Sequence, residues 1–453
     1  MFLDDYKKDY LIPYLKACQA FWMVESQKPV LSRMLYFKDY FNLLQFNYYL
    51  FYKYCYGTIK AMSDYNDYNN KNLCKHLNLF EAYKLLDNNT KNIEKEYGLH
   101  PENGHCVKIS ETSRFYLYQI NPTQKIPKVT HKPVLIIPPY VLGPNILSFL
   151  PNEQKSYIHA FANQGIPTYL RIAKDIHSAP EVQAMTGEDD VNDTAFFCQF
   201  LKKKHNQKVI LNGFCQGGFM ALCSVLSGKL DDLVDALITC VTPIDGTRGG
   251  SLAEYMNSLP PSFQNLNYAV KILPNGSKVI DGDIMSWVYK LKDIDREAPA
   301  VAFLNELRNA GNTNNTAAAI KYWLIYDRKD LPVNVIKLSY NSYSVPISKD
   351  GTLPIELFGQ KLNLNHFKNK NIRWLLCISE KDDLVNKEVS LVPLKFINEG
   401  TEPGKIEVTV FPKGHAAIAT SWPHPDTEYA LNKEFLFQEK KYRGPVRFCL
   451  DLS

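Results

Sequence analysis

The stretch KVILNGFCQGGFMALCSVLSG, residues 208–228, determines the fold that we expect for this chain. It begins with a short apolar run, passes through a turn that contains three glycines, and continues as an apolar segment rich in small residues. The run is typical of a buried strand and the segment of a helix, and the glycines between them indicate a tight turn. Cys215 lies within that turn, at the start of the predicted helix, where the helix dipole favours a thiolate over a thiol.

The turn around Cys215, Gly-Phe-Cys-Gln-Gly, fits the nucleophile elbow G-x-S-x-G of α/β-hydrolases, with cysteine in place of serine. The elbow requires glycines because the nucleophile adopts a strained backbone conformation in which neighbouring Cβ atoms would collide. The alternative is a core cysteine at a strand end, because unpaired cysteines are usually small buried hydrophobic residues. The turn alone does not decide between these interpretations.

Two predicted strands that follow this turn each end near a residue suited to catalysis. The strand IRWLLCIS is followed by Asp382 and Asp383, and the strand KIEVTVFP is followed by a loop with His415. Nucleophile, acid and histidine therefore occur in the chain order of an α/β-hydrolase. A polar turn or an isolated histidine would explain each residue separately, but the order of all three favours a catalytic site.

We therefore expect Cys215 to be the nucleophile and His415 to be the base that takes its proton. Asp382 is expected to orient the imidazole, and Asp383 remains open as the alternative acid. A thiol that attacks a thioester forms another thioester, and this acyl-enzyme keeps enough driving force to acylate an alcohol if water is excluded. The cysteine thus favours acyl transfer from a thioester, a reaction that requires no cofactor.

The loop after an earlier predicted strand is a candidate for the oxyanion hole. KPVLIIPPY, residues 132–140, is typical of a buried strand that runs into a Pro-Pro loop. In an α/β-hydrolase this loop donates one backbone amide to the oxyanion, and the residue after the nucleophile donates the other. We expect the first donor at Tyr140 or Val141 and the second at Gln216, although an ordinary strand-ending turn would also explain the loop.

The order of the predicted elements divides the chain into three parts. Strands and helices alternate over residues 99–245 and 370–453, which predicts an α/β-hydrolase core with a mostly parallel sheet and helices on both faces. The alternation is lost over residues 246–369, which we interpret as a cap inserted over the active site. Residues 1–98 are predicted to be α-helical with a wide aromatic face. That face packs on the core or, alternatively, forms a homodimer contact or binds a lipid or polyester granule.

The composition argues against several classes of protein. The 453 residues carry a net charge of +5, which is mild for this length and does not indicate nucleic-acid binding. The 10 cysteines form no CxxC pairs or Cys/His clusters, so we expect neither a metal site nor a disulfide framework. The first residues lack the profile of a signal peptide, and no apolar span is long enough for a transmembrane segment. We therefore expect a cytoplasmic protein.

Together these motifs resemble the polyhydroxyalkanoate synthase superfamily. Three short motifs match it: the GxCxGG box at residues 213–218, the Pro-Pro-aromatic loop at residues 138–140, and the Gly-His pair at residues 414–415. The segment W-x-x-x-D-x-x-D-L-P, residues 323–332, is similar to part of the cap in that family. The resemblance covers the chain from about residue 132 to the C-terminus.

The resemblance places Cys215, Asp382 and His415 on the nucleophile, acid and base of the family. The reaction it implies is polymerisation of 3-hydroxyacyl-CoA into a polyester with release of CoA. The chain also departs from the family pattern. Asp383 stands where the family usually has histidine, and residues 171–175 replace a tryptophan-containing motif expected after the second core strand.

Other features are similar to intracellular polyester depolymerases, namely the Cys-Gln elbow, the Asp-Asp acid turn and the Pro-Ile-Asp stretch at residues 243–245. Three functions are therefore considered. The first is a synthase-like acyltransferase, and the second is a depolymerase or thioesterase of the same superfamily. The third is an inactive granule-surface or interaction protein that uses the N-terminal aromatic helices.

Overall fold

The computed structural model describes residues 51–60, 62–64, 90–124, 131–258, 266–285, 315–397 and 405–452. Most of the predicted N-terminal helical region therefore lies outside the described residues, as does the middle of the predicted cap. The described residues of the N-terminal region before residue 65 are helical. The chain falls into two compact units: residues 1–95, 254–271 and 280–330 form one, and residues 96–253, 272–279 and 331–453 form the other.

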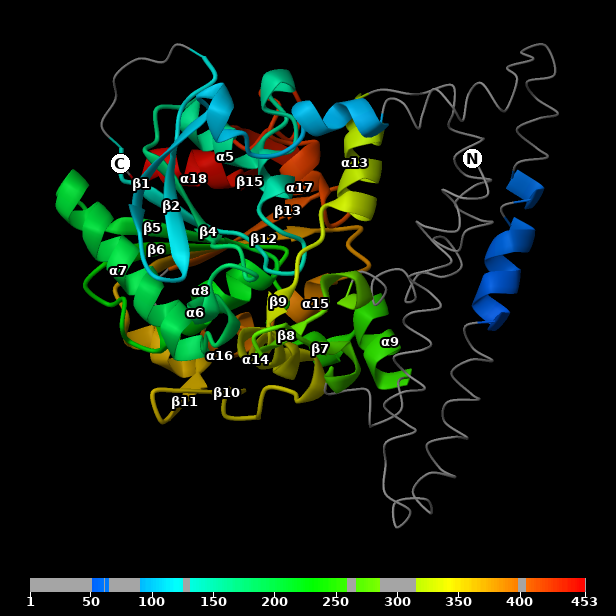
Figure 1. Ribbon diagram of the computed structural model, residues 1–453. Coiled ribbons are helices and arrows are strands. Elements are labelled where there is room, and N and C mark those ends of the chain that lie inside the picture. The colour runs from blue at the N-terminus through cyan, green and yellow to red at the C-terminus, as the bar shows by residue number, and fades with distance from the viewer. Residues whose placement is uncertain are drawn as a thin grey trace. The chain divides into compact units, whose positions relative to one another are not determined.

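The second unit is built on one large sheet of eight strands in the order β1-β2-β4-β3-β5-β6-β12-β13 (Figure 1). In that order the strands are β1 (Cys106–Glu111), β2 (Phe115–Ile120), β4 (Thr168–Ala173), β3 (Val134–Ile137), β5 (Val209–Phe214), β6 (Val234–Cys240), β12 (Arg373–Ser379) and β13 (Ile406–Phe411).

Strand direction identifies the fold. β2 pairs antiparallel with β1 and with β4, whereas every pair from β4 to β13 is parallel. An antiparallel second strand, followed by a reversal in the order of the third and fourth strands, is the arrangement of the α/β-hydrolase fold. The predicted fold is thereby confirmed. All residues of β3 and β5 are buried, as expected for parallel strands covered on both faces.

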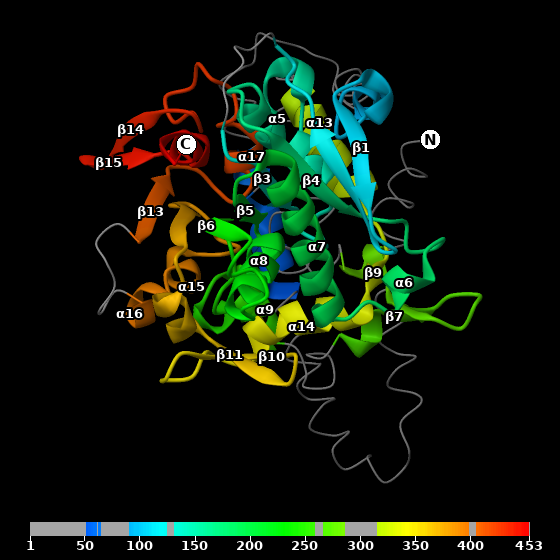
Figure 2. The same ribbon diagram turned by 90° about the vertical axis from the view of Figure 1, so that its left-hand side faces the viewer.

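Helices cover both faces of this sheet (Figures 1 and 2). One layer contains α7 (Gly187–His205) and α8 (Gln216–Leu226), and the opposite layer contains α5 (Tyr157–Ala162), α17 (Ala417–Thr420) and α18 (Pro445–Asp451). α7 begins with a capping box in which Thr186 and Asp189 satisfy each other's backbone amides. It ends in a basic last turn, which the helix dipole favours.

Part of the predicted cap packs into the main core. α14 (Val333–Ser344) and the hairpin of β10 (Thr352–Leu357) and β11 (Gln360–Asn363) belong to the second half of the predicted cap. Their buried side chains belong to the same hydrophobic cluster as residues of β5 and α8. Residues 331–369 are therefore held to the sheet by the hydrophobic effect, and α14 contacts both α7 and α8.

The remaining elements are short. The helices are α6 (Pro180–Gln183), α9 (Ser251–Ser258), α13 (Asn315–Tyr326), α15 (Lys387–Ser390) and α16 (Leu394–Ile397), and the strands are β7 (Val270–Ile272), β8 (Lys278–Ile280), β9 (Leu331–Pro332), β14 (Glu434–Phe437) and β15 (Lys440–Arg443). The 3-10 turns are η3 (Ile93–Lys95), η4 (Pro101–Asn103), η5 (Asn145–Ser148), η6 (Pro151–Glu153), η7 (Gly246–Arg248), η9 (Asn267–Ala269) and η11 (Leu364–Asn369).

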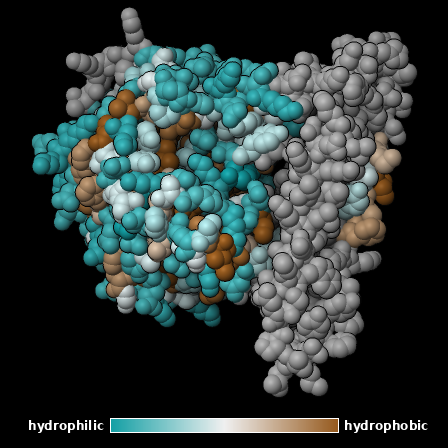
Figure 3. Space-filling view, viewed as in Figure 1, coloured by the Kyte–Doolittle hydropathy of each residue, from teal (hydrophilic) through white to brown (hydrophobic). Residues whose placement is uncertain are grey.

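The described surface seen in Figure 3 is mostly hydrophilic, with small scattered hydrophobic groups. Large exposed hydrophobic side chains occur on the N-terminal helix, at Phe51, Tyr52, Tyr56, Ile59 and Met62. They agree with the aromatic character predicted for this region, whose role stays a prediction. Within the described residues, no helix combines the length and the apolar character needed to cross a bilayer.

The glycines of the turn between β5 and α8 are explained by close backbone contacts. A Cβ atom on Gly213 would lie 2.4 Å from the Cα atom of Gly218, and one on Gly217 would lie 2.2 Å from the carbonyl oxygen of Ile137 in β3. A Cβ atom on Gly218 would lie 1.9 Å from Oγ1 of Thr242. The GxCxGG pattern is therefore required by the tight packing of α8 against the ends of β3 and β6.

Substitution of Gly217 by alanine tests this packing. In an ordinary helix, Gly→Ala stabilises by up to about 1 kcal/mol. At Gly217 the added methyl group meets the backbone of β3, so we expect Gly217→Ala to lower the free energy of unfolding by about 1–3 kcal/mol. Urea unfolding followed by circular dichroism measures the change. Unchanged or increased stability would show that α8 does not approach β3 this closely.

Candidate active site

Cys215 occupies a strained bend between β5 and α8. Its backbone has φ 51° and ψ −122°, a conformation that non-glycine residues rarely adopt and that often marks functional sites. The bend is held by a hydrogen bond from the Cys215 amide to the carbonyl oxygen of Cys240 in β6, at 2.7 Å. The side chain is nearly buried, with 7% of the residue exposed. Cys215 is also the N-cap of α8, so its thiol lies beside the positive end of that helix.

The structure places His415 against Asp382. Nδ1 of His415, in the loop after β13, lies 2.7 Å from Oδ2 of Asp382, in the loop after β12. The other oxygen, Oδ1, accepts hydrogen bonds from the amides of Leu384 and Val385 at 3.0 and 2.9 Å. The carboxylate is therefore held by three hydrogen bonds in a buried position, and it fixes the orientation of the imidazole.

Asp383, the alternative acid, lies differently. Its residue is exposed, and its carbonyl oxygen accepts hydrogen bonds from the amide and hydroxyl of Ser251 at 2.8 and 2.9 Å. The two neighbouring residues thus differ, because Asp382 is buried with its carboxylate against the imidazole whereas Asp383 is exposed. The geometry favours Asp382 as the partner of His415.

The protonation of His415 depends on both neighbours. Burial lowers the pKa of the imidazole, but the negative charges of Asp382 and Cys215, together with the hydrogen bond to Asp382, raise it to about 10. Nε2 of His415 is buried and has no hydrogen-bond partner of good geometry within the described part of the chain. This nitrogen is the one available to exchange a proton with the thiol or with a substrate. Cys215, His415 and Asp382 are thus brought together in the order that the sequence predicts.

The predicted oxyanion donors also lie together, in an arrangement that the sequence does not reveal. The amides of Tyr140 and Val141 both donate to Oε1 of Gln216, each at 3.1 Å. Nε2 of Gln216 donates in turn to Oγ of Ser339 in α14, at 2.6 Å. The backbone amide of Gln216 is in the first turn of α8, where helix amides have no partner within the helix. That amide can therefore donate to a ligand.

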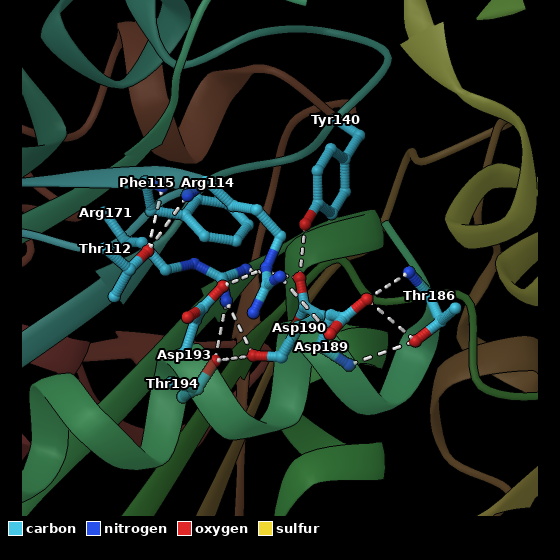
Figure 4. Close-up of polar contacts among 10 residues, drawn as sticks. All are labelled: Thr112, Arg114, Phe115, Tyr140, Arg171, Thr186, Asp189, Asp190, Asp193 and Thr194. Atoms are coloured by element: carbon cyan, nitrogen blue, oxygen red, sulfur yellow. Dashed lines mark hydrogen bonds and ion pairs between the residues drawn. The ribbon is translucent and has the colours of Figure 1, made fainter. Parts of the chain in front are cut away.

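A buried ion pair fixes the other end of Tyr140 (Figure 4). Its hydroxyl donates to Oδ2 of Asp190 in α7, and the same oxygen accepts a hydrogen bond from Arg171 at 2.9 Å. Arg171 also donates to Thr194 at 2.6 Å and lies over the ring of Phe115, 4.2 Å from its centroid. Burial and the charge of Asp190 raise the pKa of Tyr140 well above its usual range, so the hydroxyl stays protonated and donates.

Arg171 belongs to the segment that replaces the tryptophan-containing motif of the resembled family. Arg171 and Asp190 are each 1% exposed, and they lie 19 residues apart in the chain. A charged residue within an otherwise apolar strand was the only sequence signal for this network, because buried charges require a partner. The sequence did not identify which partner, and the contribution of Asp190 to the site was missed.

A helix of the predicted cap, α14, brings Tyr343 near the nucleophile. Tyr343 of this helix packs its ring against Gly246, where a Cβ atom would lie 2.3 Å from the ring. Burial and the negative charge of Cys215 raise the pKa of Tyr343 well above its usual range. Tyr343 is therefore close enough to Cys215 to interact electrostatically. Tyr343 and Ser339 were not singled out from the sequence, because their positions depend on long-range packing of α14.

Comparison with known proteins adds little beyond the fold. No protein family model matches the chain, and no curated protein matches it. Similar solved structures include Est1E from Butyrivibrio proteoclasticus, with 11% identity, a TM-score of 0.34, and coverage of 69% of this chain and 90% of that one. Carboxylesterase CesB from Bacillus subtilis has 10% identity, a TM-score of 0.34, and coverage of 75% and 94%.

An esterase domain from Rhodothermus marinus has 11% identity and a TM-score of 0.35, with coverage of 70% of this chain and 94% of that one. At such identities and TM-scores these structures say nothing about the substrate of this chain. The fold assignment rests on the strand order and directions described above.

The pairing of His415 with Asp382 is testable by titration. The charge of Asp382 is a main cause of the raised pKa, so Asp382→Asn should lower the pKa of the His415 imidazole from about 10. NMR titration of the labelled ring measures it, with His415→Gln to assign the signal. Asp383→Asn is the matched control and should leave this pKa unchanged. A larger fall in the Asp383 variant would reassign the acid.

Proposed function

We propose that this protein is a synthase-like acyltransferase that carries 3-hydroxyacyl groups from CoA thioesters, through a thioester on Cys215, to a growing polyester. The observation that carries the proposal is the placement of Cys215 at a strained bend beside a His415 imidazole that Asp382 orients. This combination supplies a nucleophile, a proton carrier and a fixed tautomer, which are the requirements of covalent acyl transfer.

The first half-reaction loads the acyl group onto Cys215. Nε2 of His415 takes the proton of the Cys215 thiol. The sulfur attacks the thioester carbonyl carbon, and the electron pair of the C=O double bond moves to oxygen. Collapse of this tetrahedral intermediate breaks the C–S bond to CoA, and the CoA sulfur takes the proton from His415.

The second half-reaction transfers the acyl group to an alcohol. The hydroxyl at the end of the growing chain gives its proton to His415 and attacks the acyl carbon. The C–S bond to Cys215 breaks, and the sulfur takes the proton back from His415. Asp382 remains ionised and stabilises the imidazolium throughout. The amide of Gln216, at the N-terminus of α8, is positioned to donate to the oxyanion.

Burial of the site favours transfer over hydrolysis. Cys215 is 7% exposed, and Tyr343 of α14 is close enough to it to interact electrostatically. An alcohol must compete with water for the acyl-enzyme, so a covered nucleophile supports an acceptor that binds in the place of solvent. This burial of the nucleophile distinguishes the proposed transferase from a thioesterase whose nucleophile is exposed to water.

The second candidate is a polyester depolymerase or thioesterase of the same superfamily. It uses the same loading step, and water replaces the chain hydroxyl in the second step. The Cys-Gln elbow and the Asp382-Asp383 turn favour this candidate. The third, an inactive surface or interaction protein, is supported only by exposed aromatic residues such as Phe51 and Tyr52.

Product analysis separates the three functions. Incubation with 3-hydroxybutyryl-CoA should release CoA and yield polymer, measured by a thiol reagent and by chromatography of the products. Cys215→Ala should lower the rate at least about 1000-fold, because the nucleophile is lost. Cys198→Ala, at a buried cysteine of α7, is the matched control and should retain activity.

Other outcomes would change the assignment. Release of CoA with only free hydroxyacid would contradict polymerisation and favour a thioesterase. Shortening of polyester oligomers without CoA would favour a depolymerase. Absence of all three reactions in correctly folded protein would contradict an enzymatic role.

A further inference from the structure

We propose that Gln216 and Ser339 are positioning residues that form a latch on the oxyanion hole. The Gln216 latch consists of the Gln216 carboxamide, the Tyr140 and Val141 amides that it accepts from, and the Ser339 hydroxyl that it donates to. In the structure the latch is closed. An acyl group can use the Tyr140 and Val141 amides only after the carboxamide leaves them. This inference rests on the proposed acyl-transfer function.

The Gln216 side chain occupies the backbone amides of Tyr140 and Val141. Oε1 of Gln216 is 3.1 Å from the nitrogen of Tyr140 and 3.1 Å from that of Val141. A backbone N–H makes one good hydrogen bond, along one direction. An oxyanion that accepts from either amide would therefore compete with Oε1 for the same proton. Tyr140 and Val141 are the residues whose amides are expected to bind the oxyanion, so the carboxamide occupies the expected donors.

Ser339 fixes the carboxamide in this place. Nε2 of Gln216 donates to Oγ of Ser339 at 2.6 Å, and that hydroxyl donates onward to the carbonyl oxygen of Ile336 at 2.9 Å. The proton of the Ser339 hydroxyl is therefore used in the bond to Ile336. Only the lone pairs of the hydroxyl oxygen face Gln216. The orientation of the amide group is settled as well, because backbone N–H groups can donate only to its oxygen. Gln216 and Ser339 are 7% and 4% exposed, so water does not replace these bonds freely.

The donors themselves are held independently of the carboxamide. The Tyr140 hydroxyl donates to Asp190, which is paired with Arg171 in a buried ion pair. When Gln216 rotates away, this anchor keeps Tyr140 and the adjoining amide of Val141 in position. Preorganised donors that do not move during the reaction are the ones that stabilise an oxyanion most. The latch can open without loss of the hole.

α14 carries a residue of the latch and a residue near the nucleophile. Ser339 and Tyr343 are one helical turn apart on this helix, and Tyr343 lies near Cys215. Cys215 is 7% exposed, so an acyl group can reach it only by displacement of neighbouring structure, and α14 is one such neighbour. That displacement would weaken the Ser339 bond and release the carboxamide. Entry of the acyl group is thereby coupled to completion of the oxyanion hole.

Two reactions of the Cys215 sulfur show whether the Gln216 carboxamide blocks the oxyanion hole or supports it. Loading from 3-hydroxybutyryl-CoA passes through an oxyanion. Alkylation by iodoacetamide does not, because the sulfur displaces iodide at a saturated carbon. Both rates are measured by mass spectrometry in wild type, Gln216→Ala and Ser339→Ala. The matched control is Ser342→Ala, which removes a buried hydroxyl of α14 that donates within the helix to the carbonyl oxygen of Ser339.

We expect Gln216→Ala and Ser339→Ala to raise the loading rate about fivefold, the effect of one ordinary hydrogen bond, and to leave alkylation unchanged. Ser342→Ala should change neither rate. A lower loading rate in Gln216→Ala at constant alkylation would overturn the latch, since it would show that the carboxamide supports the hole. Equal ratios of loading to alkylation in all variants would also overturn it.

A second measurement does not depend on the proposed substrate. Butyraldehyde adds to a cysteine thiol: the sulfur bonds to the carbonyl carbon, the C=O double bond becomes single, and the thiol proton ends on that oxygen. A crystal structure of this adduct on Cys215 should show the Gln216 carboxamide moved off the Val141 amide. A carboxamide still bound to both amides would overturn the latch. A displaced carboxamide in protein that no thioester acylates would support the latch and contradict only the proposed function.

Discussion

The close contact between the start of α8 and the end of β3 is the constraint on which the site depends. A side chain at Gly217 would collide with the carbonyl oxygen of Ile137, so the chain must turn there without a Cβ atom. That contact forces the bend at Cys215 and directs its thiol towards the carboxyl edge of the sheet. The same contact brings the loop with Tyr140 and Val141 within hydrogen-bond distance of Gln216. The nucleophile and its surroundings follow from one packing requirement.

The charges around the bend determine how His415 can act on Cys215. His415 and Asp382 follow neighbouring parallel strands, β13 and β12, whose carboxyl ends meet at the same edge of the sheet as Cys215. Burial alone would keep the imidazole neutral, yet the two negative neighbours raise its pKa to about 10. The imidazole can therefore take and hold a proton, which is what the base beside a cysteine nucleophile must do.

The sequence predicts those features of the site that depend on contacts between residues close together in the chain. The glycine spacing around Cys215 identifies the elbow because each glycine is required by a steric contact, and the order of Asp382 and His415 follows from strand order. Neighbouring residues such as Asp382 and Asp383 are harder to distinguish. Which one faces the imidazole depends on a turn closed by two backbone amides.

Features that depend on distant contacts could not be predicted. Gln216 meets Ser339 across 123 residues of chain, and the partner of Arg171 is decided by how α7 packs on the sheet. The part of the predicted cap from residue 331 onward packs into the main hydrophobic cluster, and no local pattern signals this. Periodicity reports which faces are apolar, but not which surface each face will meet.

The most direct test of this account is to identify the atom that carries the acyl group. Protein mixed with 3-hydroxybutyryl-CoA, quenched within the first turnover and digested, can be analysed by mass spectrometry. The account predicts one 3-hydroxybutyryl group on the peptide that contains Cys215, bound as a thioester that hydroxylamine removes. Release of CoA with Cys215 unmodified, or an acyl group on a different residue, would contradict it.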